Sequence, residues 1–361
     1  MKLTLVVGAR PNFMKVASLI NATKEFENIQ FTLVHTGQHY DKNLNEVFFE
    51  DLEIPKPDIN LEVGSGSQAF QTAEIMVKFE LFLRTHETDF VIVVGDINSS
   101  MACAIVAKKM NFRLAHIEAG LESGDREMPE EINRLIIDAI ADYYFATTKY
   151  AVDNLLKRGI SSNKIFLVGN TMIDSLIRSL PKIRPSEHQN KITKEYVLLT
   201  LHRPSNVDSF EKLNSILKVI EDSTLDNLQI VFPLHPRTLK KISDEYLENN
   251  KFVILEPLRY LEFLYLIKNA KLIITDSGGI QEETSYLKKP CLTLRNSTER
   301  PETCSQGTNI LIGDDYQLIK QHVQEIINGN EKKGTVIEFW DGNTGNRIIK
   351  KLKEILDLEK G

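Results

Sequence analysis

Acidic residues end two apolar runs in the first half of the chain. Asp96 follows the run 90–95, and Glu118 closes the run 113–118. Carboxylates that converge in a cleft shift one another's pKa and can divide the roles of acid and base between them. Glu130 and Glu131 begin the next predicted helix, where acids ordinarily complement the helix dipole, so this pattern alone indicates a structural role for both.

The first apolar run ends in a segment with two cations. Arg10 and Lys15 flank a predicted helix start at Pro11. The free N–H groups of a helix start favour anions, so the segment suits a phosphate as well as it suits an ordinary loop. Its lone glycine, Gly8, is not the GxGxxG fingerprint of dinucleotide sites, which argues against tightly bound NAD.

The second half of the chain opens with a run that ends in a histidine. His202 and Arg203 follow the run 196–201, and His235 follows the next run in the same way. A histidine at a strand end can act as an acid or donate to a phosphate. It can equally cap a loop, and the residues alone leave both interpretations open.

The strongest local pattern lies further on. Ser277, Gly278 and Gly279 separate an apolar run from a predicted helix, so a ligand can approach the backbone and its N–H groups can meet a diphosphate. Glu283, one turn into that helix, can accept both hydroxyls of a ribose. Arg300 follows the next apolar run and can reach a phosphate.

Metal and disulfide chemistry are not indicated. The segment 35–41 holds two histidines and an aspartate, but their spacing matches no familiar metal motif, which favours a surface turn. Cys103, Cys291 and Cys304 are scattered and odd in number, so they form neither a disulfide framework nor a zinc motif. This cysteine usage fits a reducing compartment.

Composition and charge place the chain among ordinary globular proteins. Of its 361 residues, 42% are hydrophobic and 26% are charged. The 44 basic and 50 acidic residues give 44 − 50 = −6, which argues against a non-specific nucleic-acid binder. The sequence has no apolar run near the roughly 18 residues of a membrane span, and its first apolar run is too short for a signal peptide. We therefore expect a cytoplasmic protein without membrane insertion.

These residues must be positioned by a repeated arrangement of strands and helices. Short, almost continuously apolar runs alternate with longer amphipathic stretches, which is typical of parallel strands buried on both faces. We predict two doubly wound α/β domains, 1–170 and 171–345, with a final amphipathic helix at about 346–361 that packs back on the first. Ligands of such sheets bind at the carboxyl ends of the strands, where the polar residues above lie.

The order of the motifs resembles one enzyme family over nearly the whole chain. The segments are GARPNFMK, GDINSS, HIEAGL, MPEEINR, GNTMIDSL, TLHRPSNVD, HPRT, TDSGGIQEE and TERPE. They resemble the non-hydrolysing UDP-N-acetylglucosamine 2-epimerases. The resemblance implies two Rossmann-like domains facing across a cleft, in the glycosyltransferase-B arrangement, and a homodimer.

The resemblance also implies a reaction. It is the reversible inversion of C2 in a UDP-2-acetamido sugar, most simply UDP-GlcNAc to UDP-ManNAc, without NAD or an obligatory metal. Because no carbonyl adjoins C2, the C2 proton is not acidic, so the family first expels UDP from C1. Loss of the C2 proton then gives 2-acetamidoglucal. Re-protonation on the other face and re-addition of UDP complete the inversion, which feeds the synthesis of cell-surface polysaccharide precursors.

Matching motif positions assign the site residues. By resemblance the catalytic residues are Asp96, Glu118, Glu130 and His202, and the UDP-binding residues are Arg10, Lys15, Phe263, Ser277, Gly278, Gly279, Glu283 and Arg300. Phe263 corresponds to the aromatic residue that stacks on the base. The resemblance reverses the structural interpretation of Glu130 but leaves Glu131 as a helix-start acid.

The sequence departs from the family at several positions. Asn12 stands where many members have an acid, and Glu122 stands where many have an arginine. Some members are activated by a second UDP-GlcNAc bound to a Gln-His-Arg-Gln run and a later arginine. Here the run is Gln38-His39-Tyr40-Asp41 and the segment 63–72 lacks arginine, so we do not expect that activation.

Other activities share parts of this pattern. Relatives act on UDP-2,3-diacetamido-glucuronic acid or on 6-deoxy sugars. A hydrolysing 2-epimerase that releases ManNAc, a glycosyltransferase with the same two-domain frame, and a non-enzymatic nucleotide-sugar sensor are the remaining alternatives.

Overall fold

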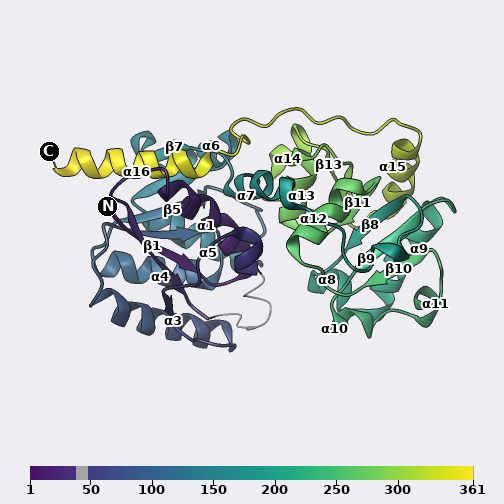
Figure 1. Ribbon diagram of the computed structural model, residues 1–361, viewed down its shortest axis with the longest axis horizontal. Coiled ribbons are helices and arrows are strands. Elements are labelled where there is room, and N and C mark those ends of the chain that lie inside the picture. Colours follow the sequence, from purple (N-terminus) through teal and green to yellow (C-terminus); the bar gives the residue numbers. More distant parts are fainter. Residues whose placement is uncertain (38–47, 361) are drawn as a thin grey trace. The chain divides into compact units, whose positions relative to one another are not determined.

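The chain folds into two compact units (Figure 1). In this computed structural model the described residues are 1–37 and 48–360, apart from the side chains of residues 236, 237 and 360. Unit 1 comprises Met1–Arg178 and Glu338–Gly361, and unit 2 comprises Ser179–Ile337. The run Gln38-His39-Tyr40-Asp41, on which the prediction about activation depends, lies outside the described residues.

Unit 1 is built on a parallel sheet whose described strands have the order β3-β2-β1-β4-β5-β6-β7. The central strand β4 is buried at every position, as expected for a strand covered on both faces. The strands are β1 (Lys2–Val7), β2 (Gln30–His35), β3 (Ile59–Asn60), β4 (Phe90–Val94), β5 (Leu114–Ala119), β6 (Tyr143–Ala146) and β7 (Ile165–Leu167).

Helices cover both faces of this sheet. In Figure 1, α3 and α4 lie on one side of the sheet, and α1 and α16 lie together on the other. The helices are α1 (Arg10–Thr23), α3 (Gln68–Leu83), α4 (Asn98–Lys109), α5 (Pro129–Ile140), α6 (Lys149–Lys157), α7 (Thr171–Ser179) and α16 (Thr344–Lys360), with a 3-10 turn at Ser162–Lys164. Residues 48–52 are also helical.

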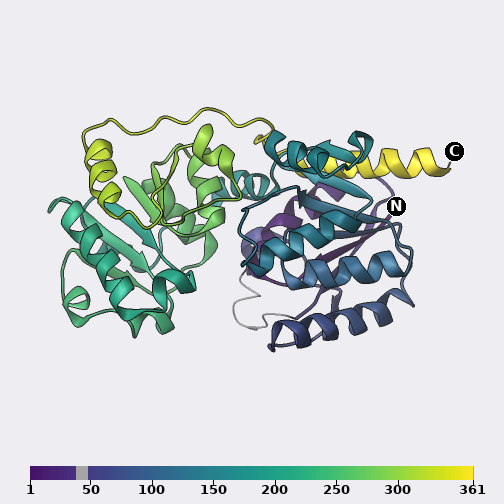
Figure 2. The same cartoon turned by 180° about the vertical axis from the view of Figure 1, so that it is seen from behind.

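The boundary between the units falls after Arg178, at the end of α7, whereas the sequence-based boundary at residue 170 precedes that helix. The reason is a buried contact that ties α7 and α16 to α1. Ser18 donates to Asp174 Oδ2 at 2.6 Å, and the Gly345 N–H donates to the same oxygen at 2.9 Å. The Ser175 hydroxyl donates to Met14 O at 2.5 Å. Figure 2 shows α16, in yellow, along the edge of unit 1 from behind.

Unit 2 repeats the plan with a second parallel sheet of order β10-β9-β8-β11-β12-β13. The strands are β8 (Tyr196–Thr200), β9 (Gln229–Pro233), β10 (Phe252–Leu255), β11 (Leu272–Thr275), β12 (Cys291–Thr293) and β13 (Asn309–Leu311). The helices are α8 (Pro204–Val207), α9 (Phe210–Ser223), α10 (Pro236–Leu239), α11 (Asp244–Leu247), α12 (Tyr260–Asn269), α13 (Gly278–Tyr286), α14 (Pro301–Ser305) and α15 (Gln317–Ile327), with 3-10 turns at Leu180–Lys182 and Gln189–Lys191.

The strand orders fix where each unit can bind a ligand. The order reverses between β1 and β4 in unit 1 and between β8 and β11 in unit 2. Crevices at the carboxyl ends of such strand pairs are the ligand sites of doubly wound sheets. The predicted fold class, two doubly wound α/β domains, is confirmed. Within residues 1–37 and 48–360, none of the helices combines the length and apolarity that crossing a bilayer requires.

Candidate active site

The turn after β1 presents its two cations differently. Arg10 is exposed at the first position of α1, with its guanidinium carbon 5.0 Å from the centroid of the Phe48 ring. Lys15, about one turn further along the helix, is buried, and its Nζ contacts Glu118 Oε2. The structure therefore brings Lys15 together with a predicted catalytic carboxylate.

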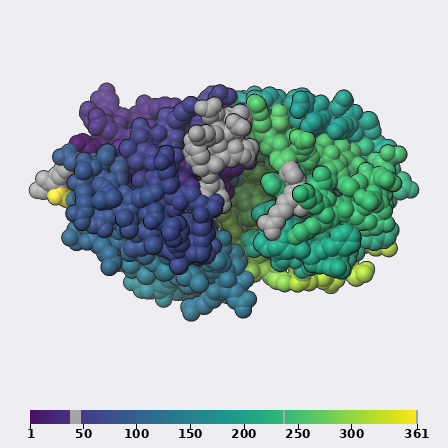
Figure 3. Space-filling view, turned by 90° about the horizontal axis from the view of Figure 1, so that it is seen from below, coloured from purple at the N-terminus to yellow at the C-terminus, as the bar shows by residue number. Residues whose placement is uncertain are grey.

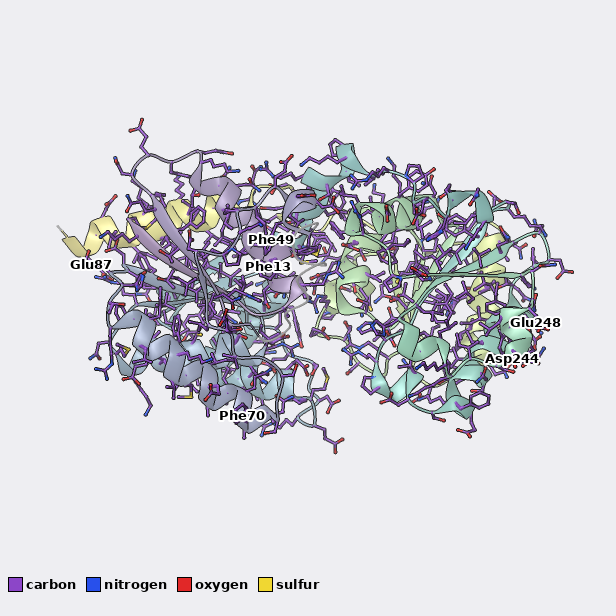
Figure 4. The ribbon with its side chains drawn as sticks, turned by 60° about the horizontal axis from the view of Figure 1, so that its bottom comes forward. Phe13, Phe49, Phe70, Glu87, Asp244 and Glu248 are labelled. Atoms are coloured by element: carbon purple, nitrogen blue, oxygen red, sulfur yellow. The ribbon has the colours of Figure 1, made fainter. Side chains whose placement is uncertain are left out.

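Asn12 holds this turn in place. Its Nδ2 donates to Val94 O at 2.9 Å, and its Oδ1 accepts from the Ala9 N–H at 3.2 Å. The ring of Phe13 packs edge-on against Phe49 with centroids 5.0 Å apart. Both residues are labelled in Figure 4. The Asn12 amide thus joins the start of α1 to the end of β4.

Glu118 has an unusual backbone conformation. The β5–β6 register shifts between Ile117 and Ala119, and Glu118 has φ of 70°. A left-handed non-glycine residue costs about 1–3 kcal/mol and often marks a functional site. Bulges of this kind re-aim a side chain. Gly95 leaves the necessary space, because a Cβ there would lie 2.9 Å from Lys15 Nζ and 3.1 Å from Glu118 Oε2.

Asp96 belongs to a second group of charges at the same sheet edge. Arg134 donates to Asp96 Oδ2 from its NH2 at 2.6 Å and its Nε at 3.0 Å. Its NH1 donates to Glu131 Oε2 at 2.6 Å, and that oxygen also accepts from the Ser123 N–H at 2.9 Å. Asp96 is partly exposed, whereas Glu131 is buried. Glu131, predicted only as a helix-start acid, therefore connects Asp96, through Arg134, to the loop after β5.

The sequence already indicated the ion pair between Glu131 and Arg134, although the prediction did not include it. Glu131 and Arg134 are three residues apart, the spacing at which opposite charges meet on a helix. Glu130 is exposed on the first turn of α5. No hydrogen bond or ion pair joins it to Glu118 or Asp96 among the residues that the structure describes.

Unit 2 has a pocket at the ends of its central strands. Its volume is about 620 Å³, within the range of small-molecule sites. Three predicted site residues line it, namely His202 after β8, Phe263 on α12 and Ser277 before α13. Thr200 and Ile280 contribute further lining. The structure thus gathers the predicted histidine, aromatic residue and serine at one cavity.

A buried aspartate holds His202, which lines this pocket. Asp276 follows β11 and is inaccessible to solvent. It accepts hydrogen bonds from the backbone N–H groups of His202 at 3.1 Å and Arg203 at 3.0 Å, and from Asn206 Nδ2 at 3.0 Å. His202 Nδ1 lies 2.9 Å from Asp276 Oδ1. Burial opposes ionisation, but the hydrogen bonds from His202, Asn206 and the Arg203 backbone keep the pKa of Asp276 below its ordinary value.

Asp276 is not among the site residues predicted from the sequence. The available signal was its position as the first polar residue after a buried strand, the same signal that selected Asp96.

Arg300 lies beside the first turn of α13 but is buried among carboxylates. Its Nε is 2.6 Å from Glu282 Oε1, and its NH1 contacts Glu299 Oε1. A Cβ on Gly278 would lie 3.1 Å from Arg300 NH1. The guanidinium therefore lies close to the helix start where a phosphate is expected, and two carboxylates already hold it.

Glu283 is enclosed within unit 2. It is buried on α13 and accepts a hydrogen bond from the Tyr260 hydroxyl at 2.9 Å. Burial raises the pKa of Glu283 to about 8. Gly279, the second residue of α13, is only partly buried. Glu283, the residue predicted to bind the ribose, is therefore surrounded by protein. The glycine turn before it remains accessible to solvent.

Comparisons with known proteins agree with this architecture. A family model described as UDP-N-acetylglucosamine 2-epimerase matches residues 21–353. The UDP-N-acetylglucosamine 2-epimerase of Methanocaldococcus jannaschii is 43% identical over 362 residues, covering 97% of this chain and 98% of the relative. The UDP-2,3-diacetamido-2,3-dideoxy-D-glucuronate 2-epimerase of Pseudomonas aeruginosa is 38% identical, covering 98% of this chain and 100% of the relative.

A solved structure is similar along its full length. The crystal structure of the M. jannaschii UDP-GlcNAc 2-epimerase in complex with UDP-GlcNAc and UDP has a TM-score of 0.89 at 43% identity. It covers 98% of this chain and 100% of that one. The matches define a class of isomerases built from two doubly wound units. The chain belongs to the UDP-N-acetylglucosamine 2-epimerase family, as its motifs predict.

Proposed function

We propose that the chain catalyses the reversible C2 epimerisation of a UDP-2-acetamido sugar, with UDP-GlcNAc and UDP-ManNAc as the pair. The observation that carries this proposal is the buried contact between Lys15 and Glu118, at the strand ends where a ligand binds, in a member of a 2-epimerase family. The relative solved with UDP-GlcNAc and UDP supports the choice of substrate.

The proposed chemistry is an elimination followed by an addition. The bond between C1 and the diphosphate oxygen breaks, and UDP leaves with the bonding electrons. A carboxylate takes the C2 proton, and the C2–H electrons form the C1–C2 double bond of 2-acetamidoglucal. In the return step C2 is protonated on its opposite face and UDP re-adds at C1. Glu118 is the carboxylate that we place nearest the proton transfers, because it is buried and its backbone is held in a strained conformation.

The remaining predicted residues have supporting roles in this proposal. Asp96, held by Arg134, influences the charge state near C2, and Glu130 is the third carboxylate of the matching motifs. His202 acts at the pocket of unit 2, where Phe263 stacks on the base and the turn at Ser277 receives the diphosphate. Other predicted UDP ligands are Arg10, Lys15, Gly278, Gly279, Glu283 and Arg300.

Incubating a panel of UDP-2-acetamido sugars in heavy water tests the proposal. We expect NMR to show deuterium at C2 and an equilibrium mixture of two UDP-sugars. Absence of deuterium with every sugar in the panel overturns the proposal. Free sugar as the main product identifies a hydrolysing enzyme, and sugar transfer to an acceptor without C2 exchange identifies a glycosyltransferase.

A second substrate has a specific observation in its favour. The P. aeruginosa relative, named for UDP-2,3-diacetamido-2,3-dideoxy-D-glucuronate, matches 98% of this chain. That UDP-sugar, together with a 6-deoxy sugar, therefore belongs in the panel. Faster C2 exchange with either sugar than with UDP-GlcNAc identifies it as the preferred substrate.

We also propose a homodimer that works in the cytoplasm on polysaccharide precursors. The exposed face of α3 supports the dimer. Phe70, Val77 and Leu81 are 57%, 58% and 61% exposed and are seven and four residues apart, the spacing of a two-helix seam. Figure 3 shows this helix, in blue, at the surface, and Figure 4 shows Phe70 on it. Leu81→Glu should shift the molar mass in light scattering to that of a monomer. An unchanged mass contradicts the assignment of this face.

A further inference from the structure

We propose that Asp138 is a positioning residue that holds Glu118 in its strained conformation. The inference rests on the proposed function, because it assigns Asp138 a part in the reaction through Glu118. Asp138 lies near the end of α5 and is 1% exposed. The chemistry proposed above gives it no direct role, so its burial and its hydrogen bonds need another explanation.

Asp138 binds the chain on both sides of Glu118. Its Oδ1 lies 2.7 Å from His116 Nδ1, and its Oδ2 accepts from the Gly120 N–H at 3.1 Å. His116 comes two residues before Glu118 and Gly120 two residues after it. One carboxylate therefore spans the irregular part of β5, where Glu118 has its φ of 70°.

A second path runs from Asp138 to the same contact. His116 Nε2 lies 3.1 Å from Gly95 O, so the histidine links the carboxylate to the end of β4. Gly95 is the residue whose Cα faces Lys15 Nζ and Glu118 Oε2. Asp138 thus fixes both the backbone that carries Glu118 and the backbone against which Glu118 and Lys15 pack.

The Asp138 carboxylate also binds an arginine that follows α6. Arg158 NH1 donates to its Oδ2 at 3.0 Å, and Arg158 NH2 lies 2.7 Å from Glu122 Oε1. Asn154 Nδ2 donates to Gly120 O at 3.0 Å. The carboxylate is therefore held in one place by His116 on β5, by the Gly120 N–H just after β5 and by Arg158 just after α6. Glu122 belongs to this network through Arg158.

Asp142 provides a matched control. It lies just beyond α5 and, like Asp138, accepts a backbone N–H, because the Leu114 N–H of β5 donates to its Oδ2 at 2.9 Å. It also accepts from a basic side chain, Lys108 Nζ, at 2.7 Å. Its contact lies at the opposite end of β5 from Glu118. Asp142→Asn therefore removes a carboxylate charge that accepts a backbone N–H, as Asp138→Asn does. It leaves the contacts of the irregular segment around Glu118 unchanged.

The test compares Asp138→Asn with Asp142→Asn by kinetics. For Asp138→Asn we expect kcat for C2 exchange to fall by roughly 100-fold, because a small misplacement of a reacting group has that cost, while KM changes little. Asp142→Asn should retain the parent kcat. Equal kcat values for the two variants, or a loss confined to KM, overturn the proposal.

Crystal structures of the same variants separate this inference from the proposed function. In Asp138→Asn we expect Glu118 to leave its positive φ and its contact with Lys15 to open, and in Asp142→Asn both should persist. Glu118 unchanged in Asp138→Asn overturns the positioning role, whichever reaction the protein catalyses. A parent enzyme without C2 exchange overturns the proposed function alone. If Asp138→Asn does not fold, His116→Gln removes the link to Gly95 and is judged by the same two measurements.

Discussion

Lys15 Nζ and Glu118 Oε2 meet across the carboxyl ends of β1 and β5, two strands that β4 separates in the sheet. Both side chains are buried, with exposed fractions of 8% and 2%. Gly95, just after β4, makes the contact possible because it has no Cβ to occupy the space. Three strand ends therefore converge on one buried ion pair, and perturbing any of them should affect the same chemistry.

Glu118→Gln should abolish most of the C2 exchange. A positioned acid or base contributes about 10²–10⁴-fold, so we expect kcat to fall by that factor. NMR in heavy water measures the exchange, and calorimetric titration with UDP establishes that unit 2 still binds. Glu87→Gln, at a residue 85% exposed and labelled in Figure 4, serves as the control and should leave both quantities unchanged. Full exchange in Glu118→Gln would exclude Glu118 as the catalytic carboxylate.

Glu130→Gln and Glu131→Gln should separate catalysis from stability. Glu131 is buried and paired with Arg134, so its loss should lower the free energy of unfolding by about 3 kcal/mol. Glu130 is exposed, so its replacement should change stability by less than about 0.5 kcal/mol. If Glu130 acts as its motif implies, its variant loses exchange activity while remaining as stable as the parent. An active Glu130→Gln would remove this residue from the catalytic set. Chemical denaturation and the exchange assay give the two quantities.

Gly95→Ala should disturb the Lys15–Glu118 contact directly. The new methyl would lie 2.9 Å from Lys15 Nζ, at a backbone φ of 64°. Gly329→Ala is the control. The φ of Gly329 is 76° and no atom lies within 4 Å of the new methyl, so this variant introduces backbone strain without crowding. We expect Gly95→Ala to lower the free energy of unfolding by about 1–3 kcal/mol more than Gly329→Ala, from overpacking. Equal losses in thermal unfolding would argue against a crowded site at Gly95.

The free energy of unfolding should depend on pH through Glu283. The pKa of Glu283 is about 8 in the folded protein, above the ordinary value of 4.5. At a pH between these two values, the carboxyl group is protonated in the folded chain and ionised in the unfolded chain. Stability therefore falls as the pH rises through this window and levels off above about pH 8. Glu283→Gln should show a weaker dependence in urea denaturation between pH 5 and 9. Glu302, whose pKa burial raises to about 7, is present in both proteins and does not affect the comparison. Parallel pH profiles would contradict the raised pKa of Glu283.

The fold class and family follow from the sequence, because apolar runs and motif order depend on local composition and on the chain's own succession of residues. The runs at 90–95 and 196–201 became the central strands β4 and β8. The positions of Asp96 and His202 directly after these strands placed both at strand ends. These features needed no knowledge of which residues pack together.

Helical spacing allows Arg134 to meet either Glu130 or Glu131, and only the tertiary structure decided that it meets Glu131. Glu130 and Glu131 are adjacent and chemically identical, yet the helix direction exposes one and buries the other against Arg134. The hydrogen bonds of Asp138, on α5, with His116 on β5 and Gly120 just after it join positions 22 and 18 residues apart. Burial, and ion pairs such as Lys15–Glu118, depend on contacts between distant segments, whereas a sequence pattern records only neighbours along the chain. The sequence therefore determined the frame and the family, and the packing determined which carboxylates meet a cation.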